Sequence, residues 1–406
     1  MHLFRRSSKR KNILLLGASG GVANAFLHTF VHHRDSINNL ILLDRSTEVL
    51  DDPYIDHQAL NYQFIQKDLI LPEKQDEYIE ILKKHQIDIV LDLTDIDAVP
   101  LVEATDKAGV NYINTAMSDE KYTVYESFQQ LWPIRDTLHH AVHIMCSGMN
   151  PGVVNMWVRY GIEKFGKPKE VIHFEYDTST PAEGWKSMMT WSVPEFIVEC
   201  VRDPSGKMMG RDKLEKILPN ALMNRVEMKD ILSPIMALNK YPRGFQVLHE
   251  ENISIAHKYD IPAQFVYAVN MTTMEHLVEI YKKKGNIVHT DLIQGQNTNL
   301  PLEGADQIGV ILEYDDKKVY YFNPSPNVPV IGTNGTYSQV IVGVYAALIT
   351  LLFDHLDKGV YFVEDLFDNM RVSEFVFHKG EHGLKLKSHN PKITLKRKNK
   401  FEHFFI

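Results

Sequence analysis

The chain has 406 residues, 44% hydrophobic and 24% charged, which is the composition of a folded globular protein with room for two domains. Its formal net charge of −8 argues against nucleic acid as a general partner and is compatible with a cationic substrate. Two cysteines, Cys146 and Cys200, give no disulfide framework and indicate a reducing compartment. No apolar run approaches the length we expect of a membrane span, so we predict a cytoplasmic protein without a membrane partner.

The first predicted elements are a strand, a glycine-rich turn and a helix. Ile13–Leu16 is a short apolar run of the kind buried in a parallel sheet, and Val22–Phe30 predicts a helix. A glycine turn between them lets backbone N–H groups at the helix start face a pyrophosphate. The pattern is G-x-x-G-x-x-A, and a strand–turn–helix that binds nothing is the alternative. We predict a dinucleotide site at this turn, formed by Gly17, Ser19, Gly20, Gly21 and Val22.

The second predicted strand, Leu40–Leu43, ends in an acid, Asp44. A carboxylate at this strand end can accept hydrogen bonds from the adenosine ribose hydroxyls of NAD. Arg45 follows, and an arginine there favours the 2′-phosphate of NADP instead. We take Asp44 as decisive and predict NAD as the cofactor.

Strands and helices continue to alternate through the first third of the chain. This alternation predicts an α/β fold with a Rossmann-type doubly wound parallel sheet. The carboxyl ends of the strands should face the cofactor, so Asp92 and Thr94 are predicted to bind it. The further strands are expected at Tyr62–Lys67, Ile87–Leu93, Val110–Asn114 and Val142–Cys146, and the helices at Gln75–His85, Ala98–Ala108 and Lys121–Ala141.

Three histidines, His139, His140 and His143, lie close together in this part of the sequence. They have no carboxylate or cysteine at metal-ligand spacing. We therefore predict solvated histidines near a helix end, and no metal site.

A turn-rich segment, Cys146–Gly152, follows the last of these strands, and Pro151 is well placed to start a helix at Val153–Phe165. The segment has two interpretations. It is either a hinge that leads to a second domain, or a loop that points the amide of Asn150 into the cleft beside the nicotinamide. We predict Asn150 as both a cofactor-binding and a catalytic residue.

Five segments in the same order resemble the bacterial homospermidine synthases, a family of the saccharopine dehydrogenase-like group. They are S-G-M-N-P-G-V-V at 147–154, E-Y-D-T at 175–178 with T-W-S at 190–192, H-E-E-N-I-S-I at 249–255, G-A-D-Q-I-G-V at 304–310 and N-G-T-Y-S-Q-V at 334–340. The resemblance runs from about Gly17 to Asp365. It implies an NAD-binding Rossmann domain over 1–147 plus 334–365, a substrate and dimerisation α+β domain over 148–333, and a C-terminal extension over 366–406. A homodimer is expected.

The resemblance also implies the reaction, an aminobutyl transfer from one putrescine to another through imine intermediates, with NAD as internal hydride carrier. Putrescine is a four-carbon chain with an ammonium at each end, so its site should carry separated acids. The candidates are Glu175, Glu199 and Asp306.

The segment from Trp191 to Glu199 can also be argued from its residues alone. Ser192 and Glu195 form a capping-box pattern, and Trp191 is placed to pack on Phe196 as a hydrophobic staple. Glu199 has no capping role and needs a partner. An indole beside a carboxylate is a good receptor for an alkylammonium ion, so Trp191 and Glu199 are predicted in the substrate site.

This chain departs from the family at two places. The family's glutamate after the strand near Asn114 is replaced by the sequence T-A-M-S, which ends at Ser118, and its two histidines in H-Y-A-Y-H-P are replaced by Val266 and Asn270. Two other classes therefore stay open. A saccharopine- or opine-type dehydrogenase would join an amino acid to a keto acid and needs cations such as Arg225 and Arg243. A nucleotide-sensing regulator would need no turnover.

The last predicted helix, Thr336–Phe353, is apolar on almost all sides. Such a helix must be covered, and we predict that it returns to the core of the first domain. The segment Lys379–Lys400 is rich in lysine and arginine, and we predict a solvated tail there rather than a surface for an anionic partner.

Overall fold

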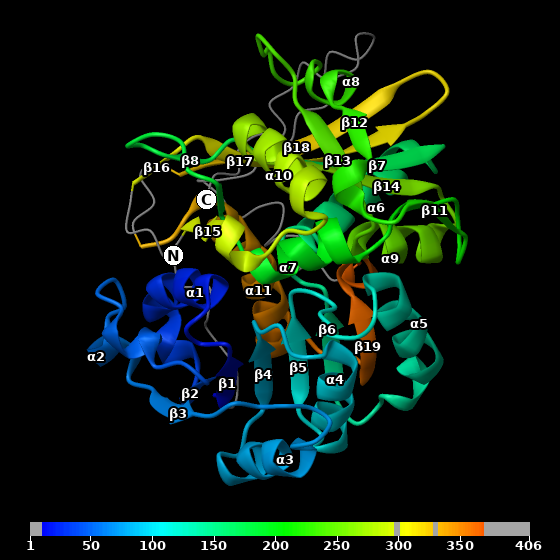
Figure 1. Ribbon diagram of the computed structural model, residues 1–406. Coiled ribbons are helices and arrows are strands. Elements are labelled where there is room, and N and C mark those ends of the chain that lie inside the picture. The colour runs from blue at the N-terminus through cyan, green and yellow to red at the C-terminus, as the bar shows by residue number, and fades with distance from the viewer. Residues whose placement is uncertain (1–9, 296–300, 328–331, 369–406) are drawn as a thin grey trace. The chain divides into compact units, whose positions relative to one another are not determined.

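The computed structural model describes residues 10–295, 301–327 and 332–368 (Figure 1). The described residues divide into two compact units, 10–152 with 340–368, and 153–295 with 301–327 and 332–339. The predicted fold class is confirmed, because the first unit is built on a parallel Rossmann-like sheet and the second on a mixed sheet. The predicted lysine- and arginine-rich tail and nearly all of the predicted C-terminal extension lie outside the described residues.

The first unit is organised around a seven-stranded sheet in the order β19-β6-β5-β4-β1-β2-β3, in which every pair is parallel. β1 lies between β2 and β4, and its four apolar side chains are fully buried, as an apolar run without alternation predicts. The edge strand β19 was not predicted from the sequence. The strands are β1 (Ile13–Leu16), β2 (Leu40–Asp44), β3 (Gln63–Gln66), β4 (Ile89–Asp92), β5 (Asn111–Asn114), β6 (Val142–Met145) and β19 (Gly359–Phe362).

The helices of this unit connect the strands as expected, with two differences, of which the first is a short helix at His57–Leu60 that was not predicted. The predicted helix over Lys121–Ala141 is shorter at both ends. Thr123 caps its start in a capping box with Glu126, and Pro133, which cannot donate a backbone hydrogen bond, lies in the last turn. The helices are α1 (Gly21–Phe30), α2 (His57–Leu60), α3 (Gln75–Lys84), α4 (Ala98–Lys107) and α5 (Val124–Ile134).

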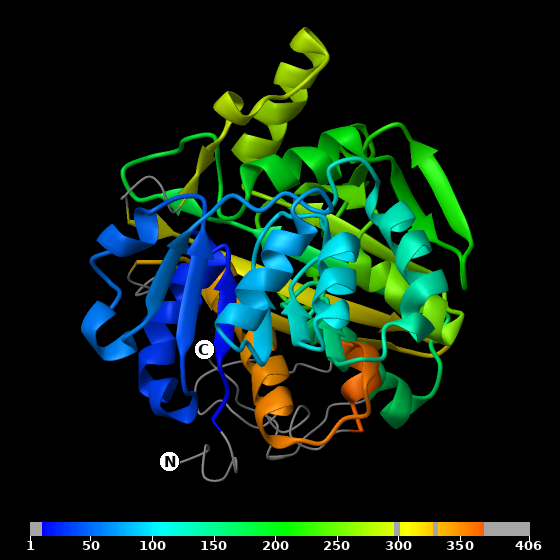
Figure 2. The ribbon, with the colours of Figure 1, turned by 90° about the horizontal axis from the view of Figure 1, so that it is seen from below.

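Helix α11 (Gly335–Phe353) packs back onto the first unit, beside α1 (Figure 2). The hydroxyl of Tyr345 lies 2.7 Å from that of Thr29 and donates to the carbonyl oxygen of Phe26. The helix is also long and apolar enough to cross a membrane by length and composition alone, which the sequence reading had not expected. Because 78% of its apolar window is buried, it is a core helix.

The second unit is built on an eight-stranded mixed sheet whose main path is β11-β10-β14-β7-β17-β18, with β13 bridging β12 and β14. β7 and β14 are parallel, and the other pairs are antiparallel. Four two-residue strands form two small ribbons. The strands are β7 (Glu170–Asp177), β8 (Thr180–Pro181), β9 (Met188–Met189), β10 (Ser205–Met208), β11 (Leu214–Leu218), β12 (Arg225–Glu227), β13 (Arg243–Val247), β14 (Ala263–Ala268), β15 (Ile293–Gln294), β16 (Leu302–Glu303), β17 (Ala305–Glu313) and β18 (Lys318–Pro326).

Helices cover this sheet. Helix α6 packs where Gly161 meets Leu312 and Tyr321, and α9 packs on β14. Side chains that alternate with these along the strands point to the other face of the sheet. They include Phe322, which belongs to an apolar cluster with Leu277 of α10. The helices are α6 (Val153–Phe165), α7 (Val193–Ile197), α8 (Lys229–Leu232), α9 (Glu250–Tyr259) and α10 (Met271–Lys284).

Gly309 of β17 leaves room for aromatic packing between the strands. A Cβ at this position would lie 2.4 Å from Cζ of Phe174 and 2.7 Å from Cβ of Phe322. Its cross-strand partners are these same two residues, in β7 and β18. The glycine therefore allows β7, β17 and β18 to keep their spacing beside a large ring.

Candidate functional site

The predicted dinucleotide turn lies between β1 and α1. Gly17 has φ +75°, and a Cβ there would lie 2.6 Å from the carbonyl oxygen of Leu93, so the position requires glycine. Gly20 precedes the first helical residue, Gly21, and Val22 follows in the first turn. With no acidic side chain in that first turn, the helix start keeps free N–H groups and a positive dipole end for a phosphate.

Asp44 lies at the end of β2, against the same turn. Its carboxylate accepts hydrogen bonds from the backbone N–H groups of Ser19 and Ser46, each at 2.8 Å. The hydroxyl of Ser19 in turn accepts from the backbone N–H of Val49 at 3.2 Å. A carboxylate has about four acceptor positions, so Asp44 orders the turn and keeps capacity for ribose hydroxyls.

Asp92 and Thr94 lie at the end of β4, next to β1. Asp92 is buried and accepts from the hydroxyl of Thr94 at 2.6 Å and from that of Tyr112 at 2.5 Å. Burial raises the pKa of Asp92 to about 6, although these hydrogen bonds lower it. Thr94 also borders the turn, because its methyl group would lie 2.9 Å from a Cβ at Gly17.

Asn150 lies in the loop that ends the first unit. The N–H of Gly148 donates to the carbonyl oxygen of Pro151 at 2.9 Å and closes this loop. Helix α11 passes close to it, because a Cβ at Gly343 would lie 2.1 Å from the carbonyl oxygen of Gly148. Asn150 is half-buried. Its roles at the cofactor and in catalysis stay predictions.

In the second unit, β7 presents His173, Glu175 and Asp177 at alternate positions, and therefore on one face of the sheet. All three are buried. Asp306 of β17 is the direct cross-strand partner of Asp177, and it also exchanges a hydrogen bond with Glu175. Two of the predicted substrate-site acids, Glu175 and Asp306, are thus in contact, and Asp177 makes a third.

Neutral side chains donate hydrogen bonds to the carboxyl groups of Asp177 and Asp306. Nε2 of Gln339 donates to Asp306 at 2.8 Å, and the hydroxyl of Thr190 donates to Asp177 at 2.6 Å. Thr336 supports Thr190 through a hydroxyl contact at 2.9 Å. In the part of the chain that the structure describes, no lysine or arginine pairs with Asp177 or Asp306.

This arrangement makes the protonated form favourable. Burial, and then the negative charge of Asp177, raise the pKa of Asp306 to about 8. Burial likewise raises the pKa of Asp177. At neutral pH Asp306 therefore carries a proton, and a bound cation would favour its release.

Trp191 contacts this face through Tyr267 of β14. Its indole N–H donates to the hydroxyl of Tyr267 at 2.9 Å, and Tyr267 is the cross-strand partner of Glu175. Trp191 also meets Phe196 edge-on, with centroids 6.2 Å apart, as the predicted staple requires. The Ser192 hydroxyl accepts from the N–H of Glu195 at 3.3 Å, which confirms the predicted N-cap.

Glu199 lies in the π-helix Val198–Arg202, which continues α7. Its partner is His249, whose Nε2 lies 3.3 Å from Glu199 Oε1. Nδ1 of His249 lies 3.1 Å from Glu250 and also bonds Glu251. Burial lowers the pKa of His249, but the three carboxylates raise it well above the ordinary value.

His249 is a candidate site residue that the sequence reading missed. The signal was present, because His249 and Glu251 belong to one of the five resembling segments, but nothing in the sequence linked them to Glu199. His249, Glu250 and Glu251 also lie close enough together to hold a metal ion. An imidazolium at His249 offsets one of the three negative charges that surround it.

The comparisons with known proteins address the first unit most directly. The family model described as the saccharopine dehydrogenase NADP binding domain matches residues 13–144. The first unit therefore carries an NAD(P)-binding domain of the saccharopine dehydrogenase-like type. No curated protein matches the chain in sequence.

Solved structures share the fold over most of the chain. The homospermidine synthase of Legionella pneumophila, solved in complex with NAD, is 15% identical, with a TM-score of 0.70, over 91% of this chain and 90% of that one. The L-glutamate-forming saccharopine dehydrogenase of Saccharomyces cerevisiae is 13% identical, with a TM-score of 0.61, over 93% of this chain and all of that one. At these identities the likeness establishes the saccharopine dehydrogenase-like fold alone.

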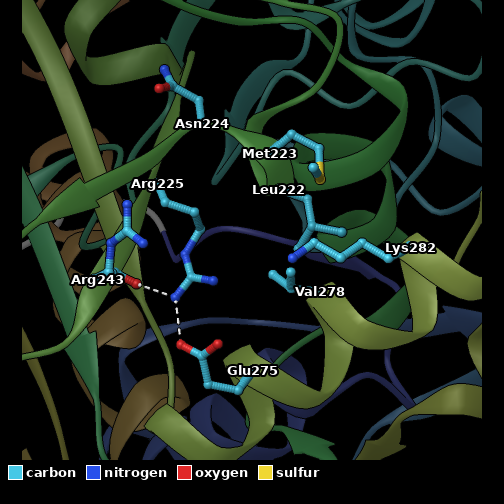
Figure 3. Close-up of a pocket in the computed structure, with 8 residues that line it drawn as sticks. All are labelled: Leu222, Met223, Asn224, Arg225, Arg243, Glu275, Val278 and Lys282. Atoms are coloured by element: carbon cyan, nitrogen blue, oxygen red, sulfur yellow. Dashed lines mark hydrogen bonds and ion pairs between the residues drawn. The ribbon is translucent and has the colours of Figure 1, made fainter.

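A saccharopine-type substrate would need cations for its carboxylates, and both predicted candidates line one cavity of about 360 Å³ (Figure 3). Arg225 donates to Glu275 at 2.9 Å and to the carbonyl oxygen of Arg243 at 3.1 Å. Arg243 pairs with Glu227. The cavity lies at the β12–β13 edge, three strands from Glu175, and both arginines already have carboxylate partners.

The histidines of the saccharopine dehydrogenase-like domain differ from expectation. His140 Nδ1 and His143 Nε2 lie 2.7 and 2.8 Å from the two oxygens of Asp106, and His143 is buried in β6. The prediction of a solvated histidine near a helix end is wrong for His143, which is buried in the sheet. Asp106 lies at the end of α4, more than thirty residues earlier, so its position beside β6 follows from the sheet rather than from spacing.

Proposed function

We propose that this chain is an NAD-dependent aminobutyl transferase of the homospermidine synthase type, which joins two putrescine molecules or similar diamines and releases ammonia. The observation that carries the proposal is the buried group Glu175, Asp177 and Asp306 on one sheet face, with the indole of Trp191 linked to it through Tyr267. Among the described residues no lysine or arginine pairs with Asp177 or Asp306, and such carboxyl groups beside an aromatic face favour an alkylammonium ligand.

The reaction follows from the chemistry of a diamine. NAD held at the glycine turn would supply a hydride acceptor for the carbon that bears one amine, and its reduced form a hydride donor. Loss of that hydride, with a proton from nitrogen, converts the C–N single bond into an imine. The amine of the second diamine adds to the imine carbon and ammonia leaves. Addition of the hydride to the carbon and of a proton to the nitrogen of the new imine gives the secondary amine, with no net change in redox state.

The residues of the chain supply charge, orientation and proton transfer. The ammonium charge of an entering diamine favours the ionised form of Asp306, so binding is coupled to proton release. Glu175 and Asp177 stand next to it and can take protons from nitrogen. The indole of Trp191 adds cation–π attraction. One carboxylate oxygen of Glu199 contacts His249, and we assign the other to a second ammonium group.

The turn at Gly17 suits a dinucleotide, because a Cβ would fill the space beside Leu93 that a close backbone approach needs. The residues that would hold NAD are those of the turn, with Asp44 toward the ribose. The family model over residues 13–144 supports a dinucleotide site here, although its description names NADP, so the preference for NAD rests on Asp44.

A saccharopine- or opine-type dehydrogenase is the alternative. Its support is the cavity that holds both Arg225 and Arg243. The acids of that cavity and of β12 already pair with these cations, whereas Asp177 and Asp306 accept side-chain hydrogen bonds from the neutral Thr190 and Gln339. This difference favours the diamine.

The decisive experiment uses purified protein, NAD and putrescine deuterated on the carbons that bear nitrogen. We expect homospermidine and ammonia by mass spectrometry, with the transferred deuterium retained in the product and no accumulation of NADH. Net oxidation of NADH or NADPH with an amino acid and a keto acid, and no product from putrescine, would establish the alternative. Asp306→Asn should lose diamine turnover, and Asp315→Asn, which changes an exposed acid, is the matched control.

A further inference from the structure

Tyr267 is a buried tyrosine whose position is fixed from several sides. It lies in β14, opposite Glu175 in β7 and Phe245 in β13. Its ring stacks on Phe265, with centroids 6.1 Å apart and planes within 18°, and meets Phe196 edge-on at 6.2 Å. Because only 1% of the residue is exposed, the surrounding packing holds the hydroxyl oxygen at one position on the sheet face that carries Glu175.

The hydroxyl of Tyr267 has two separate hydrogen-bonding capacities. One lone pair accepts the indole N–H of Trp191 at 2.9 Å. The hydroxyl hydrogen stays available to donate toward the acids, because burial, and then the charges of Glu175 and Asp177, raise the pKa of Tyr267 well above its ordinary value. The oxygen that holds the indole thus belongs to the residue paired with Glu175 across the sheet.

Trp191 needs such an anchor more than an ordinary core residue does. It is only half-buried, and its contact with Phe196 fixes one side of the ring. An indole that contacts only Phe196 can turn about its side-chain torsions, and a cation–π contact depends on which face it presents. The hydrogen bond to Tyr267 selects one orientation.

We infer that Tyr267 is a positioning residue, which holds the indole of Trp191 in the orientation that receives the ammonium group. The inference rests on the proposed diamine function and names a residue that carries out no chemistry on the substrate. Tyr267 acts through Trp191, so its effect should vanish when the indole is absent.

A double-mutant cycle tests this dependence. Tyr267→Phe keeps the ring packing and removes only the oxygen, so we expect unchanged NAD affinity and a diamine kcat/KM about tenfold lower, the worth of one cation–π contact. Trp191→Phe should give a similar loss. The double variant should be no worse than Trp191→Phe alone. Losses that multiply in the double variant would overturn the inference, since they would mean that Tyr267 acts independently of the indole.

The control is Tyr281→Phe, because its hydroxyl also accepts one hydrogen bond, from Asn220 at 2.8 Å, but lies on α10. It should cost comparable stability and leave diamine kinetics unchanged. An equal loss of diamine activity in Tyr281→Phe would show that the effect of Tyr267→Phe is general destabilisation, and it would contradict the inference.

A second readout does not depend on turnover. In protein labelled with ¹⁵N-tryptophan, the indole N–H of Trp191, assigned by its loss in Trp191→Phe, should exchange slowly with solvent. Tyr267→Phe should raise that exchange rate at least tenfold, and an unchanged rate would contradict the anchoring role. If the wild-type protein turns over no diamine, the proposed function fails, and this exchange measurement still decides whether Tyr267 holds the indole.

Discussion

Asp177 and Asp306 are direct cross-strand partners in the antiparallel pair β7–β17, and both are almost completely buried. Like charges opposite each other destabilise a sheet, so the pair is tolerable only when at least one proton is shared between them or a cation lies beside them. This relationship makes the second sheet sensitive to pH and to cationic ligands.

The stability of the protein should therefore fall as pH rises. The pKa of Asp306 is about 8 in the folded protein, above its ordinary value of 3.8, so the folded form holds a proton that the unfolded chain releases between these values. The free energy of unfolding should decrease through that window by at most about 1.4 kcal/mol per pH unit for each proton. Urea unfolding at pH 5, 6, 7 and 8 measures the slope.

Asp306→Asn should flatten this dependence, because an amide does not titrate and its oxygen can still accept from Gln339. Part of the slope should persist through Asp177, whose pKa is also raised. Asp315→Asn should keep the wild-type slope. Parallel curves for wild type and Asp306→Asn would show that the pair does not hold the proton.

Trp191 and Glu199 can be separated from their structural roles by substitution. Trp191→Ala should raise the diamine KM or lower kcat by roughly 1–2 kcal/mol, about tenfold or more, with NAD affinity unchanged. Glu199→Gln keeps shape but loses charge, so it should weaken diamine binding and leave the fold intact. Steady-state kinetics with putrescine and calorimetry with NAD measure both.

Glu195→Gln is the control for Glu199→Gln. Glutamine can still serve in a capping box, and the backbone N–H of residue 195 that Ser192 caps is untouched. If the two glutamine variants show the same diamine kinetics, the ammonium site lies elsewhere and the dehydrogenase alternative gains support.

Cofactor choice should depend on Asp44 rather than Arg45. The carboxylate is held at the ribose end of the turn by Ser19 and Ser46, where it would repel a 2′-phosphate. We expect tighter binding of NAD than NADP, a smaller preference in Asp44→Asn, and no change in preference in Arg45→Ala, since Arg45 is exposed. Calorimetric titration of each protein with both cofactors measures this. Tighter NADP binding by the wild type would assign the choice to Arg45.

Gly343→Ala should destabilise the protein, against the usual trend. In an ordinary helix interior, alanine is about 1 kcal/mol better than glycine. In α11, however, the new Cβ would lie 2.1 Å from the carbonyl oxygen of Gly148, so the helix or the loop must shift. We expect a lower thermal midpoint by calorimetry. A higher midpoint would mean that the loop moves freely.

The sequence was a good guide to the first sheet because buried parallel strands need nothing but apolar side chains. Ile13–Leu16 and Leu40–Leu43 fulfil that condition alone. Strand β19 was not predicted because it pairs with β6, more than two hundred residues earlier, and this pairing arises only in the assembled sheet. The short helix α5 could have been predicted, since its capping box and Pro133 are both visible in the sequence.

The site shows the same limit. Each acid could be named from the chain, but register decides which acids meet, and the sequence does not show that Asp177 faces Asp306 or that Tyr267 faces Glu175. The partner of Glu199 was likewise invisible, because His249 reaches it from the start of another helix. The roles of these residues in binding and catalysis remain predictions.

Gly309 has a consequence for this pair of acids. Phe174 and Glu175 are neighbours on β7 but point to opposite faces, and the ring of Phe174 fills the space that a side chain at Gly309 would take. Anything larger than hydrogen at that position would force β17 away from β7, and Asp306 away from Asp177. The separation of the two carboxyl groups, and with it the effect of Asp177 on the pKa of Asp306, is thus governed by aromatic packing behind the sheet.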